Sequence, residues 1–378
     1  MKPIIYLDNS ATTKPCEKSI EYMNNALQKS WGNPSSLHTL GYEAEITLNS
    51  ARETLAKAIK VSPDEIIFTA SGTEANNTAI MAVQNRNWGN RVITTEIEHP
   101  SVLQTVKRLE EKGFEIIRLK SQADGKISLE DLKNALSEKT VLVSIMLVNN
   151  ETGAIQPIAQ AVELVRKLSP RALFHCDAVQ AFGKIPVNVK ALGVDLMTVS
   201  GHKVHAPKGI GFLYCKKGVK IPAFITGGGQ ERGMRSGTES VPLAAAFEGA
   251  VKEMPEINLA HEKISDIKNY AIKLFNESGF IKINSPEDSI PYILNISVRG
   301  YRSETLLHFL ESKNIFVSSG SACAKGETSY VLGALGLDKM EIDSALRISF
   351  SRETVKEEID ELYNALKEAT QKLRRSEK

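Results

Sequence analysis

Between about residues 50 and 225, short apolar runs alternate with amphipathic stretches, and this alternation restricts the fold more than any other feature of the sequence. The apolar runs have the length of buried strands, while apolar residues in the intervening stretches recur at helical spacing. Strands that alternate with helices need crossover connections, which produce parallel pairing and place helices on both faces of the sheet. The sequence therefore predicts an α/β fold whose large domain contains a mostly parallel seven-stranded sheet flanked by helices. The predicted strands are residues 65–69, 91–95, 114–119, 141–147, 172–176, 196–199 and 211–215, and the helices between them include residues 74–84, 101–112, 129–136 and 158–167.

A different pattern begins near residue 255 and predicts a second, smaller α+β domain. Its expected helices are residues 261–277, 303–311 and 354–374, and its expected strands are residues 281–284, 293–298 and 345–350, after a connecting helix at residues 242–253. We therefore expect a large domain at residues 16–255 and a small domain at residues 256–378, which the N-terminal segment 1–15 joins.

Composition and charge argue against several classes of protein. The 378 residues are 42% hydrophobic and 24% charged, as in a soluble globular protein, and a net charge of +2 argues against direct binding of nucleic acid. No apolar run approaches the roughly 18–20 residues of a membrane span, and the N-terminus lacks a signal-peptide pattern. The four cysteines form no CxxC pair, so neither a metal site nor a disulfide framework is predicted. We expect a cytoplasmic protein with reduced thiols.

A lysine and an aspartate follow two of the predicted strands. Lys203 ends the motif SGHK after one strand, and Asp177 comes directly after another, with Gln180 three residues later. In sheets of this type, ligands bind beyond the carboxyl ends of the strands. A lysine amine can form a Schiff base with the aldehyde of pyridoxal phosphate (PLP), and a carboxylate can keep its pyridine nitrogen protonated, so that the ring acts as an electron sink. The presence of Lys203 and Asp177 after two of the predicted strands therefore predicts a PLP enzyme.

His99 and Asn150 also follow predicted strands and are therefore expected at the same edge of the sheet. A histidine there could stack on a cofactor ring or move a proton, whereas an isolated loop histidine is often only structural. The shared edge favours a functional role for His99. Asparagine can hydrogen-bond a phenolic oxygen, but Asn-rich turns also occur for purely conformational reasons.

Two segments have features that suit a phosphate. Gly72 and Thr73 open a predicted helix directly after a strand, where free N–H groups and the helix dipole favour an anion, although an ordinary N-cap would look the same. Residues 227–238 combine three successive glycines with two arginines. This segment suits a phosphate or a subunit interface, and a flexible surface loop with solvated arginines is the alternative.

Cys323 and Arg347 stand in unusual surroundings. Cys323 lies in a run of small polar residues close to Lys325, which favours a reactive thiolate over a buried structural thiol. Cys176 and Cys215, by contrast, have the apolar neighbours of a buried cysteine. Arg347 lies inside a predicted strand and needs a partner there, which could be a substrate carboxylate or a structural ion pair.

Taken in chain order, these segments resemble the NifS/IscS-type cysteine desulfurases, which have the class V aminotransferase fold of fold type I PLP enzymes. The resemblance runs nearly from end to end. Its motifs are YLDNSATT at residues 6–13, GNPSSLH at 32–38, SGTE at 71–74, EH at 98–99, NNETG at 149–153, DAVQ at 177–180, SGHK at 200–203, RSGT at 235–238 and GSAC at 320–323.

The resemblance implies a role for each candidate residue. Lys203 would carry PLP and act as a proton shuttle, Asp177 would pair with the pyridinium, and His99 would stack on the ring. The remaining cofactor-binding residues would be Gln180 and Asn150 at the ring oxygen or substrate, Gly72, Thr73, Ser200 and His202 at the phosphate, and Thr238 reaching the phosphate from the second subunit of a homodimer.

The resemblance also implies the reaction. Arg347 and Asn33 would hold the carboxylate of L-cysteine, and Cys323, on a mobile loop of the small domain, would take the substrate sulfur as a persulfide and leave alanine. The persulfide would pass to an acceptor protein for iron–sulfur cluster assembly or for tRNA or cofactor thiolation. Only residues 324–328 separate Cys323 from the run SYVL, and so short a connection favours a dedicated acceptor.

Two alternatives remain at this point. A selenocysteine lyase or another class V PLP enzyme would share the fold, although transamination has no use for a mobile thiol such as Cys323. A non-catalytic sulfur-transfer scaffold would also share it, but Lys203, Asp177 and Cys323 would then have no reason to occur together.

Overall fold

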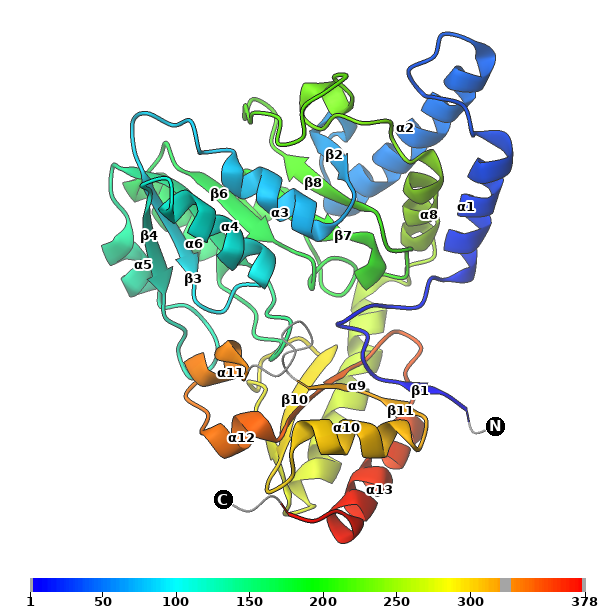
Figure 1. Ribbon diagram of the computed structural model, residues 1–378, viewed down its shortest axis with the longest axis vertical. Coiled ribbons are helices and arrows are strands. Elements are labelled where there is room, and N and C mark those ends of the chain that lie inside the picture. Colours follow the sequence, from blue (N-terminus) through cyan, green and yellow to red (C-terminus); the bar gives the residue numbers. More distant parts are fainter. Residues whose placement is uncertain (1–2, 320–327, 376–378) are drawn as a thin grey trace.

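The computed structural model describes residues 3–319 and 328–375, and it confirms the predicted fold class (Figure 1). The central sheet has seven strands in the order β2-β8-β7-β6-β5-β3-β4. Their bounds are Ile66–Thr69 for β2, Arg91–Thr95 for β3, Glu115–Leu119 for β4, Thr140–Met146 for β5, Leu173–Asp177 for β6, Leu196–Ser200 for β7 and Gly211–Cys215 for β8.

The sheet is parallel except at β8, which runs antiparallel to both of its neighbours, β2 and β7. Residues 201–210 alone connect β7 to β8, and a parallel crossover usually needs a dozen or more residues with a helix. The short connection therefore reverses the chain direction and keeps the turn that contains Lys203 close to the end of β7.

Two hydrophobic clusters cover the two faces of this sheet. Successive strand residues point to opposite faces, so that Ile93 belongs to one cluster and Val92 to the other. The cluster around Val92 takes its helical residues from α3 and α4. The cluster around Ile93 takes them from α2, α6 and α8, among others, and continues through helices in the second part of the chain. These helices are Gly72–Met81 (α3), Pro100–Glu110 (α4), Thr39–Ile59 (α2), Ile158–Leu168 (α6) and Val241–Lys252 (α8), with α5 at Leu129–Ala135 and α7 at Val189–Leu192.

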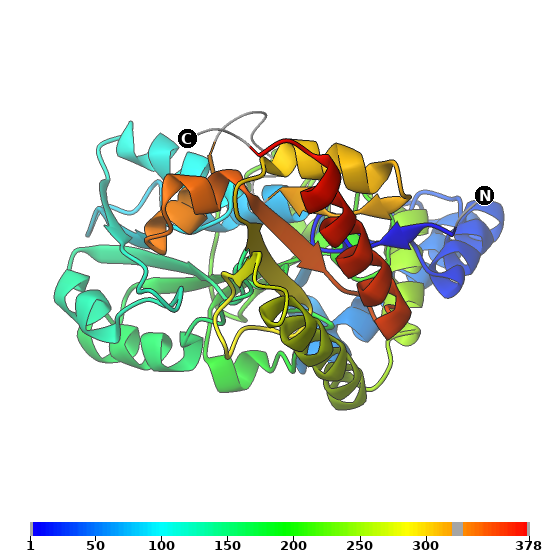
Figure 2. The same ribbon diagram turned by 90° about the horizontal axis from the view of Figure 1, so that it is seen from below.

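The second part of the chain contains an antiparallel four-stranded sheet in the order β12-β13-β10-β9 (Figure 2). The bounds are Ser318–Ser319 for β12, Ala345–Ser349 for β13, Ile293–Val298 for β10 and Ile281–Ile283 for β9, and the helices are α9 (Ile257–Asn276), α10 (Ser303–Glu311), α11 (Tyr330–Ala334), α12 (Lys339–Asp343) and α13 (Lys356–Lys372).

The N-terminal segment packs against this second part. Strand β1 (Ile5–Tyr6) pairs in parallel with β11 (Ile315–Phe316), and Asp8 forms a bridge to Ser349 of β13. The chain then turns toward the central sheet. Residues 8–13 therefore lie between the two parts, close to the end of β7.

The predicted helices do not include α1 (Glu17–Lys29), α2, the four-residue α7, α11 or α12. Helices α11 and α12 have five residues each, which is too short for a periodic pattern to appear. Among the described residues, no helix is long and apolar enough to cross a membrane.

Helices α1 and α8 pack closely enough to require a glycine, which generates our first prediction. A Cβ at Gly249 would lie 2.5 Å from the backbone oxygen of Lys18 and 3.0 Å from Cα of Ser19. We expect Gly249→Ala to destabilise the protein by about 1–3 kcal/mol through this backbone contact, measured by urea unfolding. Gly333→Ala is the control, because its Cβ would meet only Ile342 at 3.9 Å and should cost nothing. Equal stability of the two variants would contradict the prediction.

Candidate active site

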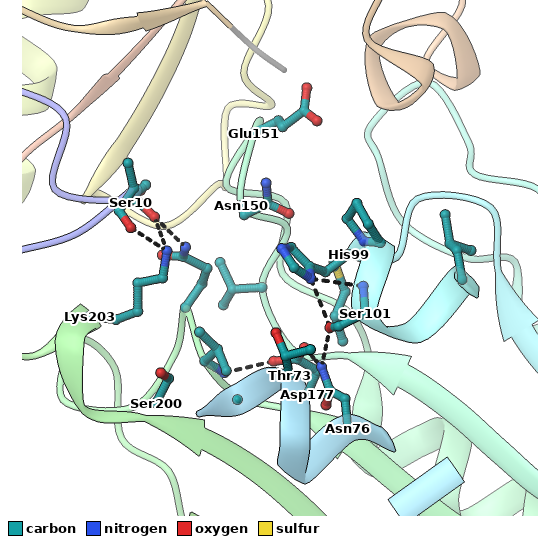
Figure 3. A pocket seen from close by; sticks show the side chains of 18 of the residues that line it. Ser10, Thr73, Asn76, His99, Ser101, Asn150, Glu151, Asp177, Ser200 and Lys203 are labelled. Atoms are coloured by element: carbon teal, nitrogen blue, oxygen red, sulfur yellow. Dashed lines mark hydrogen bonds between the residues drawn. The ribbon is translucent and has the colours of Figure 1, made fainter. Parts of the chain in front are cut away.

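A cavity of about 900 Å³ opens beyond the carboxyl ends of the central strands (Figure 3). Its volume suits a cofactor together with a small substrate. Ten residues expected at a site from the sequence line it: Gly72, Thr73, His99, Asn150, Asp177, Gln180, Ser200, His202, Lys203 and Arg347. Asn33 and Thr238 are exposed and do not line this cavity, and Cys323 lies outside the described residues.

Lys203 reaches the cavity from a short turn, Gly201–Lys203, that directly follows β7. Its Nζ donates hydrogen bonds to the backbone oxygens of Ser10, at 2.5 Å, and Ala11, at 2.8 Å. The N-terminal segment thus holds the lysine amine at the wall of the cavity, as Figure 3 shows for Ser10.

Asp177 is the last residue of β6 and is 6% exposed. Its two carboxylate oxygens accept N–H groups from Asn76 Nδ2, at 2.7 Å, and from the backbone of Val179, at 2.9 Å. These donors fix the orientation of a carboxylate that borders the same cavity as Lys203.

His99 is connected to Asp177 by a short chain of hydrogen bonds. Asn76 Nδ2 donates to Asp177 and also to Ser101 Oγ, at 2.8 Å. Ser101 Oγ lies 2.8 Å from Nδ1 of His99, which also accepts the Ser101 backbone N–H at 3.1 Å. Because Nδ1 accepts, the neutral ring carries its proton on Nε2. Burial lowers the pKa of His99 and favours this neutral form; the charge of Asp177 opposes the shift, and the charge of Lys203 adds to it.

The start of α3 and the end of β7 form a concave surface that suits a phosphate. A Cβ at Gly72 would lie 3.0 Å from Val179 Cγ2 and 3.3 Å from Ser200 Cβ, so glycine allows a close approach of the helix that a larger residue would crowd. The first N–H groups of a helix have no partner within the helix and favour an anion. Together with the Thr73 and Ser200 hydroxyls, this surface fits the phosphate of PLP.

His202 lines the cavity beside that surface. Burial and neighbouring cations, Lys203 first among them, lower its pKa to about 4. Its Nδ1 lies 3.2 Å from Thr12 Oγ1. A neutral imidazole that accepts the threonine O–H at Nδ1 presents an N–H at Nε2, which is the group a phosphate oxygen needs.

Gln180 is bonded to the protein at both ends of its amide. Nε2 donates to the backbone oxygen of Ser10 at 3.0 Å, and Oε1 accepts from Lys184 Nζ at 2.8 Å. Burial lowers the pKa of Lys184 to about 7, with Lys203 and Arg347 contributing in the same direction. The amide of Gln180 is therefore a fixed part of the cavity wall.

Arg347 is 2% exposed. The sequence predicted either a substrate carboxylate or a structural ion pair as its partner, and the structure contains the ion pair, with Asp8. Nη2 donates to Asp8 Oδ1 at 2.9 Å, and Nη1 donates to the backbone oxygen of Asn150 at 3.1 Å. Its Nε has no hydrogen-bond partner within the described part of the chain. The guanidinium therefore lines the cavity with one buried N–H that has no partner among the residues described, while its ion pair with Asp8 holds it in place.

Several residues in or beside the cavity received no role from the sequence, among them Asn76, Ser101, Glu98 and Glu151, although the last two belong to the motifs EH and NNETG. Asn76 lies one helical turn after Gly72 and therefore on the same face of α3, a spacing that could have identified it. Glu98 and Glu151 directly adjoin His99 and Asn150 in the chain. Burial raises the pKa of Glu151 to about 7, and the hydrogen bond from Ser329 and the charge of Arg347 oppose this shift.

Glu98 precedes His99 and is a fully buried carboxyl group that does not line the cavity. Oε1 accepts from Thr95 Oγ1 at 2.8 Å and from the Met146 backbone N–H at 2.9 Å, while Oε2 has no partner among the described residues. Burial raises its pKa to about 8, and the nearby Asp177 raises it as well. At neutral pH Glu98 is therefore mostly protonated.

The raised pKa of Glu98 predicts a pH-dependent effect on stability. Its contribution is fully present below the unfolded-state pKa of 4.5 and is lost as the pH rises through about 8. Glu98→Gln removes this titration, so the variant should gain stability over the wild type between pH 5 and pH 9, by at most roughly 5 kcal/mol. Thermal unfolding across this range measures the difference. Glu115→Gln is the control, because this exposed carboxylate bonds Arg91 and has a lowered pKa. A constant difference between Glu98→Gln and the wild type would contradict the prediction.

Comparisons with known proteins agree with this geometry. The family model for class-V aminotransferases matches residues 5–362. Cysteine desulfurase IscS of Clostridium botulinum is 40% identical over 97% of this chain and 94% of its own length. A solved NifS-like protein superposes with a TM-score of 0.92 at 38% identity, covering 98% of this chain and 100% of its own. SspA, solved in complex with cysteine, is 32% identical with a TM-score of 0.82 over 93% of this chain and 100% of its own. This chain therefore belongs to the class-V aminotransferase family and, within it, to the NifS/IscS cysteine desulfurases.

Proposed function

We propose that this protein is a PLP-dependent cysteine desulfurase that converts L-cysteine to L-alanine and collects the sulfur as a persulfide on Cys323. The observation that carries the proposal is the meeting of Lys203, Asp177 and Arg347 in one cavity at the carboxyl ends of the central strands. These are the three charged groups that a PLP enzyme acting on an amino acid needs. Membership of the cysteine desulfurase family supports the choice of reaction.

The residues of the cavity fit PLP. Lys203 would hold the aldehyde, Asp177 would hold a proton on the pyridine nitrogen, and His99 would lie against the ring. Gly72, Thr73, Ser200 and His202 would bind the phosphate, and Asn150 and Gln180 would face the ring oxygen or the substrate. Bound in this way, PLP supplies an electron sink for the substrate carbons.

Lys203 and Arg347 would act on the substrate itself. Arg347 would hold its carboxylate, helped by Asn33, and Lys203 Nζ, once released from the aldehyde, would move protons between substrate carbons. The hydrogen bonds from Lys203 to the Ser10 and Ala11 carbonyls show that protein oxygens are available to hold this ammonium at the cavity wall.

Cys323 would remove the sulfur. Its thiolate attacks the substrate sulfur, an S–S bond forms as the Cβ–S bond breaks, and the electron pair left on Cβ takes a proton to give alanine. The net reaction converts L-cysteine and the Cys323 thiol into L-alanine and a Cys323 persulfide, without an external oxidant. A soft, polarisable thiolate suits attack on sulfur.

A homodimer would complete the site. Thr238 and Asn33 are exposed and do not line the cavity of their own chain, which suits contributions across a subunit interface. Residues 27–46, at the junction of α1 and α2, also expose large apolar side chains, with Trp31 at 64% and Leu37 fully exposed, and Leu27, Tyr42 and Ile46 more than half exposed. Exposed apolar groups this close together mark an interaction surface, and we assign it to a second copy of this chain.

The persulfide would then pass to an acceptor protein in the cytoplasm, for iron–sulfur cluster assembly or for thiolation of tRNA or a cofactor. The short connection between Cys323 and Ser329 favours a dedicated acceptor over many different ones.

Two variants test the chemistry by separating cofactor binding from sulfur removal. Alanine formation from L-cysteine is measured with a thiol reductant present, beside the visible absorbance of lysine-bound PLP. We expect Lys203→Ala to lose the absorbance and the activity, because the attachment point is gone. Cys323→Ala should keep the absorbance and form alanine only at background rate. Cys215→Ala, at a buried cysteine remote from the cavity lining, should behave as the wild type. Full alanine formation by Cys323→Ala would contradict the proposed nucleophile, and no alanine from a yellow wild-type protein would contradict cysteine as substrate.

Sedimentation velocity tests the proposed dimer. The wild type should sediment as two chains, and a variant carrying Trp31→Glu and Leu37→Glu should sediment as one and retain PLP less well, since buried charge opposes an apolar interface. Leu259→Glu is the control, because Leu259 is equally exposed, at 65%, but lies on α9. A monomeric wild type would contradict the dimer.

A further inference from the structure

The first residues described after position 327 are attached to the loops that hold His99 and Asn150. Ser329 Oγ donates to Glu151 Oε2 at 2.5 Å, and Tyr330 Oη donates to the backbone oxygen of Glu98 at 2.6 Å. Glu98 and Glu151 each adjoin one of the two cavity-lining residues in the chain. A segment from the C-terminal part of the chain is thus bonded directly to the two loops that form the cavity rim.

Helix α11 continues this attachment. Ser329 caps the helix, accepting the Leu332 N–H at 3.1 Å, so its hydroxyl both donates and accepts. Val331 and Leu335 pack with Ile97 in a small hydrophobic cluster of their own, separate from the two clusters of the central sheet. A five-residue helix has little stability alone, so these contacts determine where it lies.

Tyr330 shows that the attachment is specific rather than a by-product of burial. Its side chain lines the cavity and is 42% exposed, yet its hydroxyl makes a short hydrogen bond to the carbonyl that precedes His99. Ser329 and Glu151, by contrast, are 6% and 4% exposed, so their hydrogen bond is shielded from water. The hydrogen bond of Tyr330 thus lies at the cavity, and that of Ser329 is buried beside it.

The position of this attachment along the chain gives it a function. Thr328 also lines the cavity and is five residues after Cys323. Five residues of extended chain span at most about 18 Å. Whatever fixes residues 328–330 at the rim therefore limits how far the Cys323 thiol can be from the cavity.

We propose that Ser329 and Tyr330 are positioning residues that anchor the segment after Cys323 to the Glu151 side chain and the Glu98 carbonyl, and so set the rate at which the Cys323 thiol reaches the substrate sulfur. The inference rests on the proposed function, because it assigns these residues a role only in the step that forms the persulfide. Neither residue is assigned a contact with the cofactor. Both act through Cys323, and the visible absorbance of Tyr330→Phe checks this for Tyr330, whose side chain lines the cavity.

The test compares Ser329→Ala and Tyr330→Phe with matched controls in the complete, PLP-loaded protein. Ser128→Ala removes a serine N-cap from α5, where Ser128 accepts the Asp131 N–H at 3.1 Å. Tyr301→Phe removes a tyrosine hydroxyl that donates to the Thr370 carbonyl at 2.8 Å. Each control loses the same chemical group at a position outside the cavity lining.

We expect both anchor variants to keep the visible absorbance and the KM for L-cysteine of the wild type. In a single turnover, persulfide formation on Cys323 should fall by about 10- to 100-fold, because small displacements of a reacting group cost this much. Ser329→Thr, which keeps the hydroxyl, should restore most of the rate. Hydrogen exchange should become faster at residues 331–335 in Ser329→Ala and Tyr330→Phe and remain unchanged in the two controls.

Three results would overturn the inference. If the wild type forms alanine and persulfide but the anchor variants form them equally fast, the inference fails while the proposed function stands. If the anchor variants lose the visible absorbance, or if the controls slow the persulfide step as much, the contacts are merely structural. If the wild type forms no persulfide on Cys323, the proposed function fails and the inference fails with it.

Discussion

A row of hydrogen bonds across β5, β6 and β7 sets the geometry on which the rest of the site depends. The ring of His175, in the middle of β6, lies 2.8 Å from Ser144 Oγ of β5 through Nδ1 and 3.0 Å from Thr198 Oγ1 of β7 through Nε2. Burial lowers the pKa of His175 to about 4, so the ring stays neutral and acts as one donor and one acceptor. A slip of one residue in either pairing would turn His175 away from its partners and move Asp177 to the other face of the sheet. The register that this histidine fixes places Asp177 opposite Thr198, just before the turn that contains Lys203.

The N-terminal segment connects this sheet to the second part of the molecule. Its Ser10 carbonyl accepts from both Lys203 and Gln180, and its Asp8 carboxylate pairs with Arg347 of β13. Thr13 bonds the backbone oxygen of His202 through its N–H at 2.8 Å. A few residues thus contact the group that would hold the cofactor and the group that would hold the substrate carboxylate. The two groups come from elements far apart in the chain, and this segment fixes their relative position.

The sequence predicted those features that depend on local pattern. The strands at residues 91–95, 211–215 and 293–298 have the predicted bounds, and the parallel order explains why Asp177 and Lys203 border one cavity. Contacts between residues far apart in the chain leave no pattern in the local sequence. The ion pair of Asp8 and Arg347 joins residues 339 positions apart. The role of Asn76 depends on its hydrogen bond to Ser101, which the approach of α3 to α4 makes possible. Helix α2 has buried residues on one face, but its charged and polar residues mix with them closely enough to weaken the periodic pattern. The antiparallel direction of β8 follows from the length of one connection rather than from the composition of the strand.

Burial keeps Glu98 and His202, two titratable groups around the cavity, mostly uncharged at neutral pH. Glu98, with a pKa near 8, and His202, with a pKa near 4, are both mostly neutral at pH 7. Neutral Glu98 adds no second negative charge beside Asp177, and neutral His202 still offers an N–H to an anion. The charged groups that line the cavity are then Asp177, Lys203 and Arg347, together with Glu151, whose pKa of about 7 leaves it partly ionised at neutral pH. The carboxylate of Asp177 matches the positive charge of a pyridinium, and the guanidinium of Arg347 matches the negative charge of a substrate carboxylate. The phosphate would meet neutral donors instead, while Lys203 would hold the aldehyde. Because these charges lie in a partly buried space, each interaction is stronger than it would be in water, and a misplaced charge would be equally costly. The same electrostatics therefore favour a ligand that places a positive ring nitrogen at Asp177 and a carboxylate at Arg347.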